Sequence, residues 1–82
     1  MESLTGFGFV ALTELTPVEV MGAAEKLNRV PLIFRVDLFK MMTLDENGRT
    51  KVELGDGIGT AVVEEDVPTV AAMVAAAWRA AR

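Results

Sequence analysis

Two short segments of the chain contain residue types that could bind a ligand or catalyse a reaction. The first is a glycine-rich run, Gly55-Asp56-Gly57-Ile58-Gly59. Glycine turns bind phosphates when a helix follows them, because the helix N-terminus receives the anion. Here an apolar strand follows, at residues 60–63, and the Asp56 carboxylate would repel a phosphate. Two interpretations remain: an ordinary tight turn, or a pore or ligand loop in which Gly55, Asp56 and Gly57 line an opening through backbone amides.

The second segment is the acidic triplet Glu64-Glu65-Asp66. Neighbouring carboxylates can do acid–base chemistry or hold a hard metal ion. No second acidic cluster lies near in sequence, and an apolar helical pattern begins at Val67. We therefore interpret the triplet as the start of a helix, with Asp66 as the N-cap and the charges complementing the helix dipole. The sequence predicts no catalytic residue and no metal site.

The composition excludes several kinds of chemistry. The chain contains no cysteine and no histidine, so disulfides, thiolate metal sites and the commonest general base are ruled out. We therefore expect neither an enzyme nor a bound cofactor. The net charge is −4 and the eight basic residues are scattered, unlike the basic stripe that nucleic acid requires. Nucleic acid and anionic membrane surfaces are not expected partners.

Length and the first residues indicate the domain count and the location. A chain of 82 residues makes one small domain, residues 1–82. Such a domain buries only about 60–65% of its unfolded surface and is often helped by oligomerisation. Met1-Glu2-Ser3-Leu4 lacks the basic region of a signal peptide. No apolar run approaches the ~20 residues of a membrane span, so we expect a cytoplasmic protein.

The apolar periodicity predicts a small α/β (α+β) domain with two helices and an antiparallel or mixed sheet of about four strands. The predicted order is β-α-β-β-β-α, with strands at residues 7–13, 32–42, 49–54 and 60–64 and helices at residues 16–30 and from 67. The first helix is predicted from three residues at its start: Thr16 as the N-cap, Pro17 at the first helical position and Glu19, which completes a capping box. Asn47-Gly48 would supply the positive φ angles of a hairpin turn.

The second helix indicates a surface that needs a partner. Between Val67 and Ala77 its one polar side chain is Thr69, whereas a surface helix normally has a polar face. The helix therefore either packs on another copy of the chain or has an alanine-tolerant surface. We take Trp78 and Val74 as interface candidates.

Two basic residues before the predicted second strand, Lys26 and Arg29, have two interpretations. They are most simply surface charges. Alternatively, they make edge contacts between assembled subunits, and we keep them as assembly-edge candidates.

Two parts of the sequence resemble a known family. The segment at residues 55–72, from the glycine run through the apolar strand and acidic triplet into the alanine-rich helix, resembles the central part of bacterial microcompartment (BMC-domain) shell proteins. The segments at residues 8–17 and 22–28 resemble the first strand and helix of that family. The resemblance implies a BMC-like or ferredoxin-like arrangement and a hexameric ring that tiles into a shell. It would place Gly55 to Gly57 at the central pore and Lys26 near the edge between tiles.

These observations lead to one functional expectation and two alternatives. We expect a structural, self-assembling subunit that forms a ring-like homo-oligomer, with other copies or other shell subunits as partners. The first alternative is a small-ligand-binding regulatory module, whose ligand would lie at a subunit interface near the glycine loop. The second is an accessory subunit of a larger enzyme complex.

Overall fold

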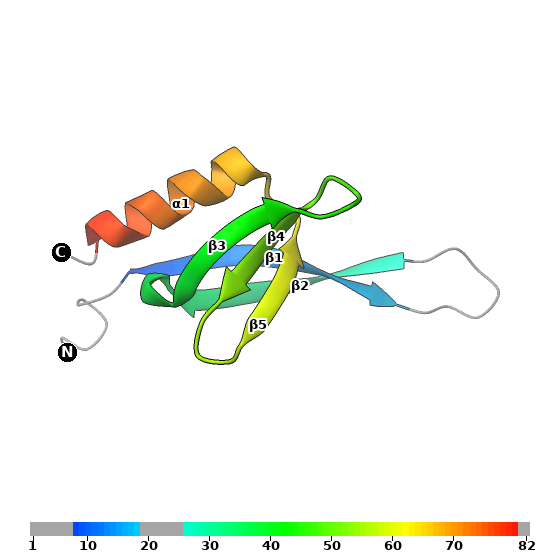
Figure 1. Ribbon diagram of the computed structural model, residues 1–82, viewed down its shortest axis with the longest axis horizontal. Helices are drawn as coiled ribbons and strands as arrows, with labels where there is room; N and C mark the ends of the chain where they lie inside the picture. Colours follow the sequence, from blue (N-terminus) through cyan, green and yellow to red (C-terminus); the bar gives the residue numbers. More distant parts are fainter. Residues whose placement is uncertain (1–7, 19–25, 81–82) are drawn as a thin grey trace.

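The structure is a computed structural model that describes residues 8–18 and 26–80. Its elements are the strands β1 (Phe9–Val18), β2 (Lys26–Arg35), β3 (Phe39–Leu44), β4 (Thr50–Leu54) and β5 (Gly59–Val63), the 3₁₀ turn η1 (Val36–Leu38) and the helix α1 (Val67–Ala80). The strands form one antiparallel sheet in the order β2-β1-β5-β4-β3. The β1–β2 hairpin crosses the β3–β5 meander at an angle, and α1 lies along one side of the sheet (Figure 1).

The predicted helix at residues 16–30 is wrong, and with it the order β-α-β-β-β-α. Thr16 and Pro17 continue β1, where they pair with Asn28 and Leu27 of β2. Residues 19–25 of that predicted helix lie outside the described residues. Within the described part, the chain has five strands and a single α-helix. Pairing with β2 overrides the capping pattern at Thr16 and Pro17, because ten residue pairs join β1 to β2.

Pro17 is compatible with a strand here because of the direction in which its nitrogen points. Thr13 uses its backbone N–H and C=O on the side away from β2, toward Glu65 and Glu64. In an antiparallel strand alternate residues share this direction, so the nitrogen of Pro17 also points away from β2. Proline therefore removes no hydrogen bond from the β1–β2 ladder.

The predicted strand at residues 32–42 is divided by η1 into β2 and β3. The backbone N–H of Val36 donates to the carbonyl of Gly8 at 2.9 Å, which extends the register of the β1–β2 pair by one more residue. The chain then turns into β3, which begins the meander (Figure 1). The hairpin predicted at Asn47-Gly48 is present between β3 and β4, although only Gly48 has a positive φ, 78°.

The core lies between the sheet and α1. Its buried side chains come from β1, β2, η1, β4, β5 and α1: Val10, Leu12, Phe34, Val36, Val52, Leu54, Val63, Val70 and Ala77. The predicted second helix is confirmed, beginning after Asp66 and running from Val67 to Ala80. Near the C-terminal end of α1, the backbone of Ala77 lies against Gly8, the residue before β1. A Cβ atom at Gly8 would collide with that backbone.

Candidate functional site

A groove of about 700 Å³ lies where the β3–β4 hairpin, the end of β5 and the first turn of α1 meet. Its walls are mainly apolar and come from Leu15, Met42, Leu44, Val63, Val67 and Pro68. Thr43 and Thr50 also belong to the lining. The groove therefore offers apolar contact along one flank of β3.

The two carboxylates at this groove are already engaged. Asp66 Oδ1 accepts the backbone N–H of Thr69 at 2.9 Å, and the Asp66 carbonyl accepts the N–H of Val70 at 3.0 Å. A hydrogen bond from the Thr69 side chain, together with that from its backbone, lowers the pKa of Asp66 below its ordinary value. Glu64 Oε1 accepts from Arg29 Nε at 2.9 Å. Both acids at the groove thus have partners within the chain.

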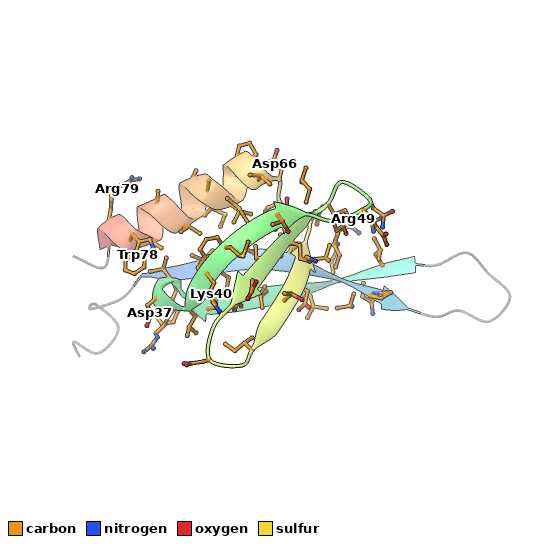
Figure 2. The ribbon with its side chains drawn as sticks, viewed as in Figure 1. Asp37, Lys40, Arg49, Asp66, Trp78 and Arg79 are labelled. Carbon is orange, nitrogen blue, oxygen red and sulfur yellow. The ribbon has the colours of Figure 1, made fainter. Side chains whose placement is uncertain are left out.

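Among the residues that the structure describes, Arg49 is the one basic residue that lines the groove. It is half-buried, and no ion pair joins it to another residue of the described ranges. Its backbone N–H donates to Asp45 Oδ1 at 2.8 Å, which closes the β3–β4 turn. Figure 2 shows Arg49 at this hairpin, on the side of the molecule away from the C-terminal end of α1.

Glu65 has a role that the sequence did not reveal. Its Oε1 accepts the backbone N–H of Thr13 at 2.9 Å, while the N–H of Glu64 donates to the Thr13 carbonyl at 2.8 Å. The side chain therefore replaces a missing strand partner at the point where β5 leaves β1. The N-cap prediction for Asp66 is confirmed. Its two acidic neighbours join the start of α1 to the β1–β2 hairpin, Glu65 through Thr13 and Glu64 through Arg29.

The ionisable side chains of the described residues are spread over the surface. Within the ranges 8–18 and 26–80, no three acidic side chains gather closely enough to hold a metal ion. No helix in those ranges has the length and apolar character needed to cross a membrane. The chemistry that the described surface offers is apolar contact, main-chain hydrogen bonding and isolated charges.

The predicted pore or ligand loop is the turn between β4 and β5. Gly55, Asp56 and Gly57 lie in this turn, where Asp56 and Gly57 have φ angles of 59° and 74°. This turn joins β4 to β5 (Figure 1). The groove lies at the other end of that hairpin, since Thr50 at the start of β4 and Val63 at the end of β5 line it. None of the three residues lines the groove. A role for this loop at a pore stays a prediction.

The assembly-edge candidates both belong to β2 rather than to a helix. Lys26 is the first residue of that strand, and its side chain lies outside the described residues. Arg29 forms the exposed ion pair with Glu64. The structure therefore gives Arg29 a contact within its own chain and places both residues on the edge strand of the sheet.

The interface candidates on α1 differ from each other. Val74 is half-buried and packs against the core, so it serves the fold of its own chain. Trp78 is 45% exposed and lies at the C-terminal end of α1 (Figure 2). Its role at an interface stays a prediction.

Sequence reasoning missed the exposed apolar residues of β3. Met41 is 49% exposed and Leu44 is 62% exposed, and both belong to the edge strand β3. The available signal was the run Phe39-Lys40-Met41-Met42-Thr43-Leu44, which has a single charge. Such an apolar strand at a sheet edge is normally covered or blocked.

No protein-family model matches the chain, and neither does any curated protein or solved structure.

Proposed function

We propose that this chain is a structural, self-associating subunit of a cytoplasmic assembly. The observation that carries this proposal is the number of large apolar side chains left exposed on so small a fold. They are Phe9, Val30, Ile33, Met41, Leu44, Ile58 and Trp78. Large apolar surface that remains exposed is typical of protein–protein contacts.

The positions of these side chains support contact with other subunits. Phe9 and Ile33 are diagonal neighbours on one face of the β1–β2 hairpin, since Ala11 pairs with Ile33 and Phe9 pairs with Arg35. Leu44 lies at the groove. Exposed apolar residues therefore occur on the hairpin, on β3 and at the end of α1, where neighbouring copies can bury them.

Solution mass tests this proposal. Light scattering coupled to size-exclusion chromatography, over a hundredfold range of concentration, is expected to show a species larger than the 8.8 kDa monomer. Electron microscopy of that species tests the ring-like, shell-forming version that the sequence resemblance implies. A monomer at every concentration would overturn the proposal in both forms.

The groove favours a second candidate function, a small-ligand-binding regulatory module. Its volume of about 700 Å³ lies in the range of about 300–1,000 Å³ that is usual for small-molecule sites. Apolar walls with Arg49 at one side suit a molecule that has an apolar body and an anionic group. A thermal-shift screen of such metabolites tests this candidate, and the absence of any stabilising compound would contradict it.

A further inference from the structure

We propose that the outer edge of β3 is a self-pairing interface, where two copies of the chain join β3 to β3 antiparallel and continue the sheet. The proposal rests on the proposed function, because it names the surface through which the subunit self-associates. Four features of the molecule support it: the difference between the two sheet edges, the direction of the β3 amides, the charges at the ends of β3 and the neighbouring groove.

Among the described strands, one edge of the sheet is interrupted by a proline and the other is not. The edges are β2 and β3. In β2, Pro31 pairs with Thr13, whose N–H and C=O point away from β2. Such a pair is not hydrogen-bonded, so the Pro31 nitrogen points outward and leaves the middle of the free edge without a donor. No proline occurs in β3.

The β3 amides alternate between the partner strand and the free edge. The N–H of Asp45 donates to the Arg49 carbonyl at 2.8 Å, across the β3–β4 hairpin. By alternation the backbone of Thr43 also faces β4, while the N–H and C=O groups of Met42 and Leu44 face outward. Pairing Met42 of one copy with Leu44 of the other satisfies these groups and places Thr43 on the two-fold axis.

The charges along β3 select the antiparallel orientation. Lys40 lies near the start of the strand, and Asp45 and Glu46 follow its end. With Thr43 on the axis, the start of β3 that carries Lys40, where the β3–β4 register shifts, comes near the turn that carries Glu46 of the other copy. A parallel pairing would bring like charges together. Within the described residues Lys40 forms an exposed 3.6 Å ion pair with Glu53, which engages only part of its ammonium group.

The groove gives the incoming strand an apolar surface to contact. Met42, Thr43 and Leu44 all line the groove, so it runs beside the edge that would be extended. In a hydrogen-bonded pair the two side chains lie on the same face of the sheet. Met42 and Leu44 of the second copy therefore lie on the groove side, next to Val67 and Pro68.

Charge reversal tests the pairing through its predicted contact between Lys40 and Glu46. Lys40→Glu and Glu46→Lys alone are each expected to weaken dimerisation about tenfold or more, since the two-fold axis repeats the repulsion. The double variant Lys40→Glu/Glu46→Lys restores attraction and is expected to return to within about threefold of the original chain. Dissociation constants come from sedimentation equilibrium.

Two further variants keep the test independent of changes in folding. Arg79→Glu changes the net charge as Lys40→Glu does, but lies at the far end of α1 and points away from the sheet (Figure 2); its dissociation constant is expected to stay unchanged. Thr43→Lys alters an exposed side chain and sets two lysines against each other across the axis, so it is expected to give a monomer. Circular dichroism verifies that each variant is folded.

The outcomes separate this inference from the proposed function. An oligomer whose dissociation constant is the same in Lys40→Glu, Glu46→Lys and Thr43→Lys would overturn the β3 interface and leave self-association standing. If the double variant dimerises no more tightly than the single variants, the proposed register is overturned. An original chain that is monomeric at all concentrations would overturn both proposals.

Discussion

The close approach of α1 to Gly8 predicts a severe effect of the substitution Gly8→Ala. A Cβ at Gly8 would lie 2.2 Å from the carbonyl oxygen of Ala77 and 2.8 Å from its Cα and carbonyl carbon. Real Cβ contacts essentially never fall below 3.0 Å. Because all three obstructing atoms belong to the backbone, no side-chain rotation relieves the contact, and α1 must move by nearly an ångström.

The cost of that movement follows from what α1 buries. Val70 is completely buried and Ala77 is 6% exposed, so shifting the helix loosens core contacts along its length. Overpacking typically costs about 1–3 kcal/mol, and we expect about 3 kcal/mol here because backbone meets backbone. For a domain of this size that lowers the melting temperature by roughly 12–24 °C.

Urea unfolding, followed by circular dichroism and by fluorescence of Trp78, measures this effect. Trp78 is the single tryptophan of the chain and adjoins Ala77, so its emission also reports displacement of the helix.

The matched control is Gly57→Ala. Gly57 has a φ of 74°, and no heavy atom lies within 4 Å of the position that its Cβ would take, so backbone strain alone should cost about 1–2 kcal/mol. A Gly8→Ala variant within about 0.5 kcal/mol of the original chain would refute the close packing of α1.

Two further predictions concern the acids before α1. Glu65→Ala removes the acceptor of the Thr13 N–H and should cost about 1–2 kcal/mol in urea unfolding, whereas Glu64→Ala, which loses an exposed ion pair, should cost at most about 1 kcal/mol; equal effects would contradict the bridging role of Glu65. The pKa of Asp66 is lowered in the folded state by hydrogen bonds from Thr69, so its contribution to stability is present above the unfolded pKa and is lost as the pH falls through the folded pKa. Asp66→Ala should therefore reduce the acid dependence of stability, and an unchanged acid dependence would contradict this role.

The sequence predicted the elements whose signals are local. The helix from Val67 and its cap at Asp66 were correct, because an acid before an apolar helical run is a local pattern. The first helix was wrong because an equally local pattern, Thr16-Pro17 with an acid at Glu19, was overridden by pairing with β2. The pairing partner of Thr16 is twelve residues away, and no rule about neighbouring residues detects it.

The candidate site was less predictable than the fold because it is formed by residues far apart in the sequence. Glu65 bonds to a backbone group 52 residues away, so the sequence could identify the acid but not its acceptor. The groove joins β3 to the first turn of α1, two segments that are separated in the sequence by β4 and β5. The apolar character of β3 was visible in the sequence, but its position at the sheet edge was not.

Hydrogen exchange of the β3 amides tests the central claim most directly, that the chain self-associates through this edge. Amide exchange is measured by NMR at a concentration well below and one well above the dissociation constant. We predict that the amides of Met42 and Leu44 become protected as concentration rises, while that of Thr43, already bonded toward β4, is protected at both. Concentration-independent exchange of Met42 and Leu44 in a chain that nevertheless oligomerises would contradict this claim.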